Sequence, residues 1–440
     1  MENKPKQFSF REYAWSQFKK NRAAYASLWV LAILAVIALF ASIIANDQPL
    51  YAKYKGETLF PAFSFENKYE ITDENGETEI VQLDIAKWKQ MNLESVIWAP
   101  IVYVPNRSDF LNSDFVGPND EQFFKDPTGK IVPMPTRFKH WLGTNKKGED
   151  VLSGLIHASR ISLTIGIFSM GVASIIGLIL GSLAGYFGDY SLTTKRGTFW
   201  SVLLGIAAGY YYAFMVRGYV LSDSIGESGL LFLWELLLSL IVFILVIGLF
   251  YLLGRMVSKL PFLNKETNIP MDSIVSRFIE ILISIPRIIL ILSIAAIAKP
   301  SIINIVLIIG FTGWTGIARI TRAEFLKIRE LEYIQAGRAL GFDQTRVIFK
   351  HALPNGIAPA LVVIAFGVAA AILIESSLSF LGVGVPPDLV TWGSLVSSGR
   401  ENMGAWWLVI FPGLAIFLTV TVYNLLGEGL RDALDPRLKT

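Results

Sequence analysis

The residue types that do the chemistry of most enzyme sites are sparse in this chain. It has 440 residues, no cysteine and three histidines, His140, His157 and His351, which lie far apart. Thiolate catalysis, disulfides and cysteine-ligated metals are excluded, and a histidine-rich metal site is disfavoured. Glu149 and Asp150 look like paired carboxylates, but adjacent side chains diverge on a helix. We interpret them as charges at the start of a helix.

Charged residues also lie inside long apolar runs, where a charge in a membrane is costly and indicates a function or a specific partner. Arg287 follows Pro286 in RFIEILISIPRIILILSIAAIA, and Glu280 precedes it by two turns. Glu375 lies in AILIESSLSFLG, and Glu235 in a further run. One interpretation assigns these side chains to a polar pathway through the membrane. The other, which needs no ligand, is that they pair with each other or with helix ends at a subunit interface.

The composition is that of a membrane protein. Hydrophobic residues make up 53% of the chain and charged residues 17%, and the mean hydropathy is +0.49. A net charge of +3, without basic runs interleaved with aromatics, gives no support to nucleic-acid binding. Because about 20 apolar residues cross a bilayer as a helix, the apolar runs predict about eight transmembrane helices. These lie at 24–45, 161–187, 198–217, 229–253, 275–297, 302–320, 357–381 and 405–427.

The placement of charge predicts the domains and their sides. Basic residues crowd segment 1–23, ahead of the anchor helix at 24–45, so the N-terminus is expected in the cytoplasm. Residues 46–158 are polar and mixed, and we expect a small extracytoplasmic domain there. Residues 159–440 form the transmembrane domain of an all-α polytopic membrane protein. An even number of spans returns the C-terminus and the basic segment 321–356 to the cytoplasm.

Segment 321–356 is unusually long and structured for a connection between spans. Its first part is rich in helix formers and ends at Gly341, a typical stop residue. Asp343 is placed to cap a second short helix, QTRVIFKHAL, which Pro354 is expected to end. Small residues between 336 and 341 would let another protein approach closely. A plain surface helix covering the bundle is the competing interpretation.

This segment resembles the EAA loop of ABC importer permeases, in which E-A-A is followed by three residues, a glycine, nine residues and x-x-Leu-Pro. The matching positions are Gln335, Ala336, Gly337, Gly341, Leu353 and Pro354. Gln335 replaces the usual glutamate, so Glu332 is the nearby candidate for any salt bridge of the motif. In the family, this loop forms the coupling helix that sits in a groove of the ATPase subunit. The resemblance therefore assigns ATPase coupling to Glu332, Gln335, Ala336, Gly337, Ala339, Gly341, Phe342, Asp343, Leu353 and Pro354.

Other stretches resemble the C-subunits of dipeptide and oligopeptide permeases. They are WLGTNKKGEDVLSGLIHASRISLTIG, GSLAGYFG, ESSLSFLGVGVPP, TWGSLVSSGR and FPGLAIFLTVTVYNLLGEGLRDALDPRL. IANDQPLYAKYKGETLFPAF and the long region 46–158 further resemble the YejE-like subgroup, associated with uptake of peptides and microcin C. The resemblance implies a type I ABC permease bundle in the bacterial inner membrane. Residues 189–272, with two spans, are an insertion into the usual six-span pattern.

The resemblance also implies a mechanism with partners. The single Gly-Lys pair, Gly129-Lys130, lacks the spacing and the Ser/Thr of a P-loop. No cofactor is therefore expected on this chain, and ATP and Mg would be bound by one or two partner ABC ATPase subunits. A second permease subunit and an extracytoplasmic solute-binding protein complete the expected importer. In the pathway interpretation, Arg287 would meet a peptide carboxylate, and Glu375 a peptide amine or a gating partner.

Three alternatives stay open at this level. An ion-driven secondary transporter would show internal repeats with paired broken helices and an acidic coupling site. A membrane-embedded enzyme would need a nucleophile–base or metal constellation, for which the chain has few residues. A nickel importer shares the permease pattern, because the solute-binding protein largely sets the substrate.

Overall fold

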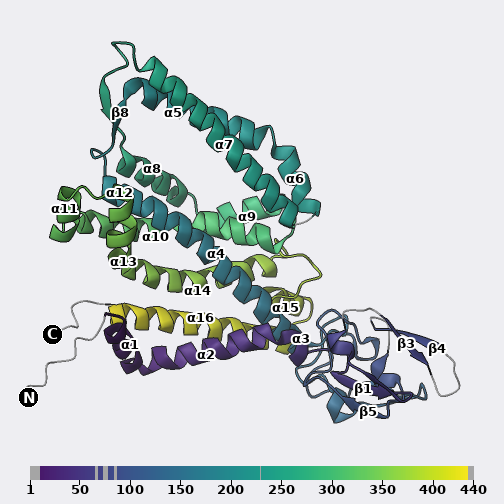
Figure 1. Cartoon of the computed structure of the whole chain (residues 1–440). Coiled ribbons are helices and arrows are strands. Elements are labelled where there is room, and N and C mark those ends of the chain that lie inside the picture. The colour runs from purple at the N-terminus through teal and green to yellow at the C-terminus, as the bar shows by residue number, and fades with distance from the viewer. Residues whose placement is uncertain (1–9, 65–67, 73–77, 84–86, 228, 435–440) are drawn as a thin grey trace, which may run out of the picture. The chain divides into compact units, whose positions relative to one another are not determined.

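The computed structural model describes residues 10–64, 68–72, 78–83, 87–227 and 229–434 (Figure 1). The chain divides into two compact units. The first comprises Met1–Met170, Pro300–Val306 and Ala365–Thr440, and the second comprises Gly171–Lys299 and Leu307–Ile364. Three long helices contribute residues to both units, namely α4 (Val151–Phe187), α10 (Ile302–Ile328) and α14 (Ala358–Phe380).

Helices at the two ends of the chain pack together in the first unit. They are α1 (Phe10–Lys20), α2 (Arg22–Leu39), the short α3 (Ala41–Ile44) and the last helix, α16 (Trp407–Leu434), which α15 (Trp392–Ser398) precedes. Asn21 caps α2 by accepting a hydrogen bond from the Ala24 amide at 3.1 Å. Phe18, Ala24 and Ala433 are buried together. A side chain at Gly429 would collide with Ala24, so the glycine allows α16 to approach α2 closely.

Between α3 and α4 lies a small domain of short strands and 3₁₀ turns, which we call the mixed domain (residues 46–150). Its strands are β1 (Tyr51–Tyr54), β2 (Glu57–Leu59), β3 (Lys68–Thr72), β4 (Thr78–Gln82), β5 (Ser95–Ile97), β6 (Phe123–Lys125) and β7 (Ile131–Pro133). Its turns are η1 (Pro61–Phe63), η2 (Trp88–Gln90), η3 (Phe110–Asn112) and η4 (Thr136–Phe138). The strand β1 pairs antiparallel with both β2 and β5, and β3–β4 and β6–β7 are hairpins. Leu59, Ile71, Val81, Leu83 and Trp88 form its apolar core.

The insertion at 189–272 forms a helical hairpin in the second unit (Figure 1). Its elements are β8 (Thr193–Lys195), α5 (Arg196–Tyr210), the π-helical turn η5 (Tyr211–Met215), α6 (Gly218–Glu227), α7 (Gly229–Val257) and β9 (Glu266–Asn268). The strands β8 and β9 pair antiparallel, and α5 packs along α7, where Gly205 lies against Phe250. The chain therefore enters and leaves the insertion at the same end. Two added spans with this connection leave the sides of all later spans unchanged.

The span predicted at 275–297 is two helices rather than one. α8 (Met271–Ser284) and α9 (Arg287–Ile297) meet at an angle of 81°. Ile285 between them is extended, as expected for a residue before a proline. Pro286 then caps α9 without continuing the α8 hydrogen-bond ladder, because it has no amide hydrogen.

Contacts within the second unit fix where this bent pair begins. The start of α8 is bonded to the end of α4, since the Asp272 amide donates to the Gly188 carbonyl at 3.3 Å. Arg322, near the end of α10, donates to Asp272 at 2.6 Å. α9 ends at Ile297, five residues before the start of α10, whose 27 residues are about 40 Å long. The pair therefore begins beside the last turns of α10 and ends near its first turn.

The predicted fold class is confirmed. Among the described residues, seven helices are long and apolar enough to span a membrane, or up to eight when the bent pair is counted as one span. The chain is thus an all-α multi-pass membrane protein with a small mixed domain after the first span. The candidate sites lie at the two ends of these helices and in the mixed domain.

Candidate coupling segment and buried charges

The coupling segment (residues 321–356) is helical over most of its length and turns sharply at a glycine. After α10 come α11 (Glu332–Ala339), α12 (Gln344–Arg346), the π-helical turn η6 (Val347–Ala352) and α13 (Leu353–Gly356). Gly341 has φ +75°, a conformation that side-chain-bearing residues rarely adopt. The Asp343 carboxylate accepts from the Thr345 amide at 3.1 Å and caps α12. Hydrogen bonding to Thr345 lowers the pKa of Asp343, so the cap is an ionised carboxylate at neutral pH.

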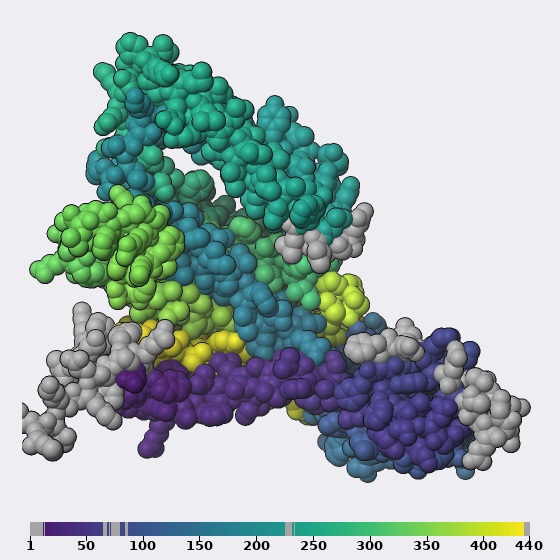
Figure 2. All heavy atoms as spheres, in the orientation of Figure 1, coloured from purple at the N-terminus to yellow at the C-terminus, as the bar shows by residue number. Residues whose placement is uncertain are grey.

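An apolar core joins this segment to two long helices. Buried residues of the core come from α4, α10, α11 and η6, and they are Tyr186, Phe325, Ile328, Ile334, Val347, Ile348 and Ala352. Ile334 and Phe325 are fully buried. Figure 2 shows the residues of this segment, in light green, gathered in one compact knob. The segment is therefore packed onto the ends of α4 and α10.

A cation adds a second attachment to α4. The Arg338 guanidinium lies 4.5 Å from the centre of the Tyr186 ring, and its Nε donates to the Tyr186 hydroxyl at 3.1 Å. A guanidinium over an aromatic face is attracted by the ring electrons. Neither residue was predicted as part of the site. Arg338 lies one helical turn after Ile334 and therefore on the same face of α11. This spacing is the sequence signal that could have indicated its contact with α4.

Most of the residues predicted for coupling lie on the accessible face of the segment. Glu332, Gln335, Ala336, Ala339, Gly341, Asp343 and Pro354 are exposed, Phe342 and Leu353 are half-buried, and Gly337 is buried. The side-chain amide of Gln335 donates to the backbone carbonyl of Glu330 at 3.0 Å, so Gln335 stabilises the preceding turn. Within the described residues, Glu332 forms no ion pair. The salt bridge considered for Glu332 is therefore absent from the segment itself.

Two exposed apolar side chains were missed. Leu340 is 73% exposed beside Gly341, and Phe349 is 60% exposed in η6. In an aqueous phase, such side chains typically mark a surface that another protein covers. The helical pattern alone could not identify them, because their exposure depends on how α11 and η6 pack on α10.

Pro354 does not end the second helix, contrary to the prediction. The chain stays helical from Gln344 to Gly356, with Pro354 in the first turn of α13. The π-helical turn before it explains why. The amide of Leu353 bonds to the Ile348 carbonyl, one residue further back than in an α-helix, and this widened turn makes room for the proline ring.

Glu375 in α14 is fully buried and well satisfied. Ser162 of α4 donates to one carboxyl oxygen at 2.9 Å, and Ser379 donates to the other at 2.7 Å. Both serines belong to the same compact unit as Glu375. The structural interpretation accounts for this group without a ligand, because hydroxyl donors replace the water it has lost.

Glu280 and Glu235 each have an arginine partner from the same region. Glu280 accepts from Arg277 at 2.7 Å, and both side chains are exposed. Glu235 of α7 accepts from Arg217 at 2.5 Å, which closes the far end of the inserted hairpin. Both are ordinary pairs of neighbouring charges, so neither requires a solute.

Arg287 differs from the three acids. Its guanidinium reaches across Gly313 of α10 and donates to the Ile309 carbonyl at 3.3 Å. Its Nε is buried and, among the described residues, has no hydrogen-bond partner. Of the four charges inside apolar runs, Arg287 is the one with unused hydrogen-bonding capacity.

The sequence matches two known protein families. The family described as binding-protein-dependent transport system inner membrane component matches residues 263–440, which include the coupling segment. The N-terminal transmembrane domain of oligopeptide transport permease C matches residues 9–60. The first of these regions holds the last four spans with the coupling segment among them, and the second holds the first span.

Curated relatives extend the similarity along the chain. The inner membrane ABC transporter permease protein YejE of Escherichia coli is 26% identical over 96% of both chains. The peptidoglycan transport system permease protein YejE of Agrobacterium fabrum is 28% identical over 96% of this chain and 92% of its own. The di/tripeptide transport system permease protein DppC of Pseudomonas aeruginosa is 30% identical over 68% of this chain and 72% of its own. The chain therefore belongs to the family of inner-membrane permease components of binding-protein-dependent ABC importers, within its YejE-like subgroup.

Proposed function

We propose that this chain is the permease subunit of an ATP-driven peptide importer and that residues 321–356 receive the motion of a partner ATPase. Family membership supports the importer, and the geometry of the coupling segment supports its role. The segment holds its apolar side chains against α4 and α10 and presents small residues with Leu340 outward. A partner that binds this face can bias the bundle, because the segment is joined to two spans by a packed core.

The names of the relatives support a peptide substrate. The Pseudomonas relative is named for di- and tripeptides, the Agrobacterium relative for peptidoglycan, and a further relative from Pectobacterium atrosepticum for glutathione. All three substrates contain peptide bonds. Nickel has no comparable support. Microcin C, a narrower expectation, stays a prediction.

The proposed assembly contains a second permease subunit, one or two ABC ATPase subunits that bind ATP and Mg, and an extracytoplasmic solute-binding protein. Both termini and the coupling segment would lie in the cytoplasm, and the mixed domain outside. Counting the bent pair as one span fits this arrangement, since eight spans return the chain to its starting side. In this assembly, Arg287 is a better candidate than Glu375 for contact with a peptide, because the Nε of Arg287 has no partner among the described residues, whereas the Glu375 carboxylate accepts from serines.

An ion-driven transporter is less well supported. It would show two corresponding broken helices in two repeats. The described residues contain one bent pair, and it lies next to the coupling segment in the same unit. A coupling segment held on two spans has no role in an ion-driven cycle.

The cysteine-free sequence allows a direct test by site-specific cross-linking. Leu340→Cys adds the only thiol of the chain at an exposed point of the coupling segment. In native membranes, a short bifunctional cross-linker should join it to an ATPase chain identified by mass spectrometry. Met403→Cys, at a position that is 92% exposed in the loop before α16, is the matched control and should not cross-link to that chain.

The same two variants test the orientation. A membrane-impermeant maleimide added to intact cells should label Met403→Cys and leave Leu340→Cys unlabelled until the membrane is opened. Labelling of Leu340→Cys in intact cells, or an absence of any ATPase cross-link in membranes that transport the peptide, would rule out the proposed coupling role.

A further inference from the structure

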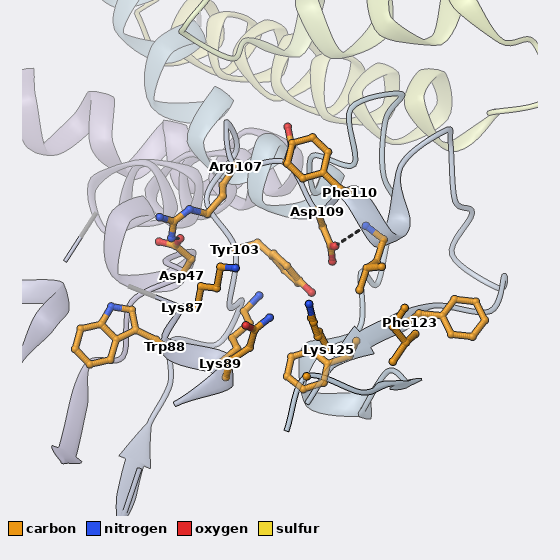
Figure 3. Close-up of a pocket in the computed structure, with 16 residues that line it drawn as sticks. Asp47, Lys87, Trp88, Lys89, Tyr103, Arg107, Asp109, Phe110, Phe123 and Lys125 are labelled. Carbon is orange, nitrogen blue, oxygen red and sulfur yellow. Dashed lines mark hydrogen bonds and ion pairs between the residues drawn. The ribbon is translucent and has the colours of Figure 1, made fainter. Parts of the chain in front are cut away.

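The mixed domain contains a cavity that the importer mechanism does not use (Figure 3). Its volume is about 640 Å³, within the range of roughly 300–1,000 Å³ that is usual for small-molecule sites. Aromatic rings form much of its wall, and Tyr103 lies at its centre. The cationic residues on its wall are Lys87, Lys89, Arg107 and Lys125. The cavity lies entirely in the first unit, before the start of α4.

The charges of the cavity do not cancel. Its two carboxylates have partners other than the lysines: Asp47 pairs with Arg107 of the same wall, and Asp109 accepts from Asn112 at 2.8 Å and contacts His140 at 3.3 Å. Within the described residues, the three lysines of the wall have no carboxylate at ion-pairing distance. Figure 3 shows their amino groups directed towards the space around Tyr103. Three cations converging on one hollow attract an anion.

Lys89 is the most constrained of the three. Its amino nitrogen lies 3.3 Å from the centre of the Tyr103 ring. The His140 ring also stacks on Tyr103, with the centres 3.9 Å apart. Desolvation lowers the pKa of Lys89 to about 7, against the opposing effect of Asp109 and Asp150. A poorly solvated amino group gains more from a bound anion than one in open water.

We propose that this cavity binds a small organic anion in which a carboxylate is attached to an apolar or aromatic group. The carboxylate would be held by the amino groups of Lys89 and Lys125. The apolar part would lie against Phe124, which lines the cavity. Few polar groups on a mostly apolar wall are the usual composition of such a site. This inference does not depend on the proposed transport function.

Calorimetry on the full chain in lipid nanodiscs tests the proposal with matched probes. N-acetyl-L-phenylalanine carries the carboxylate, and its primary amide has the same shape without the charge. At pH 6, the acid should bind at least about tenfold more tightly than the amide, because the charge-assisted bonds are lost. Equal binding of the two probes, or no binding of the acid at millimolar concentration, would overturn the proposal.

Variants locate the site. Lys89→Met should weaken binding of the acid by at least about tenfold. Lys125→Met is an independent test, because Lys125 is an exposed strand residue whose substitution should not disturb the fold. We expect its affinity for the acid to fall by a smaller factor, a few-fold. Lys55→Met is the matched control, because Lys55 also lies over a tyrosine ring, at 5.6 Å, but lines no part of the cavity. Unchanged binding in both cavity variants would contradict the assignment.

Two conditions separate the ligand class from plain anion binding. Inorganic phosphate should bind far more weakly than the acid, and tight phosphate binding would replace the organic carboxylate with a simple anion. Binding of the acid should weaken from pH 6 to pH 8.5, because Lys89 loses its proton near pH 7. His140, Asp109 and Asp150 lie near the Lys89 amino group and can also titrate. If Lys89 causes the pH dependence of binding, that dependence must be smaller in the Lys89→Met variant.

Discussion

The coupling segment and the mixed domain are both polar regions outside the spans, and they use their side chains in opposite ways. The coupling segment buries a core of apolar residues against α4 and α10, and it exposes small residues together with Leu340 and Phe349. The mixed domain turns aromatic and cationic side chains towards a cavity. The first arrangement suits docking of a protein, and the second suits holding a small molecule. The contrast shows that polarity alone does not distinguish a coupling surface from a binding site.

The two regions also differ in their attachment to α4. The coupling segment holds the end of the helix through the apolar core around Tyr186. The mixed domain holds its beginning through Asp150, whose carboxylate accepts from the Ser153 amide at 2.7 Å and contacts the His140 ring at 2.9 Å. Asp150 is therefore a helix-start charge, as predicted, with a second role in the mixed domain. One attachment depends on packing and the other on hydrogen bonds, so they should respond to different perturbations.

The largest effect is expected from a charge in the packed attachment. Ile334→Asp places a carboxylate in a fully buried apolar position, which costs several kcal/mol of free energy. The coupling segment should detach from α10, and ATP-driven uptake should fall by more than about tenfold. Peptide uptake is measured in membrane vesicles that contain as much of the Ile334→Asp variant as of the unsubstituted chain. Ile334→Val, which removes one methyl group, is the control and should keep most of the uptake.

A smaller effect is expected at the turn of the same segment, where strain and docking can be separated. Gly341 has a positive φ but open space around it, so any side chain adds about 1 kcal/mol of strain without a clash. Gly341→Ala should therefore retain most of the uptake. Gly341→Trp adds the same strain plus bulk on the accessible face, and it should uncouple ATP hydrolysis from uptake. Equal uptake by the two variants would mean that no partner covers Gly341.

The smallest effect concerns the hydrogen-bonded attachment, and it depends on pH. Burial opposes the charged form of His140, but hydrogen bonds with Asp109 and Asp150 prevail and raise its pKa above the ordinary value of 6.5. The stability that His140 contributes is therefore complete below pH 6.5 and is lost as the pH rises through the raised value. We therefore expect weaker protection of the mixed domain above the raised pKa of His140 than below it.

Hydrogen exchange of the mixed domain, compared between the chain and its His140→Gln variant, measures this contribution. Lys89 must be considered, because its lowered pKa makes the folded state more stable as the pH rises from about 7. Lys89 is present in both chains, so subtracting the protection of the variant from that of the unsubstituted chain removes most of the Lys89 effect. The same protection in both chains at pH 6 would show that His140 does not hold the mixed domain to α4.

Several features could be predicted from local sequence, for physical reasons that act over short distances. The spans follow from apolar runs of sufficient length, and the seven helices with the bent pair agree with them. The turn at Gly341 and the cap at Asp343 follow from backbone preferences of single residues. The continuation of the helix through Pro354 was not predicted, because a π-helical turn depends on how Val347 and Ile348 pack on α10.

The amino-acid sequence is enough to show that this chain crosses a membrane, where the structured segment 321–356 lies, and which family the chain belongs to. These properties depend on composition, spacing and local motifs. Three features follow from the folded chain instead: serines from two helices satisfy Glu375, the Nε of Arg287 has no partner among the described residues, and three lysines line one cavity with Tyr103. Each of these depends on distances between residues far apart in the chain, and no local pattern specifies such distances.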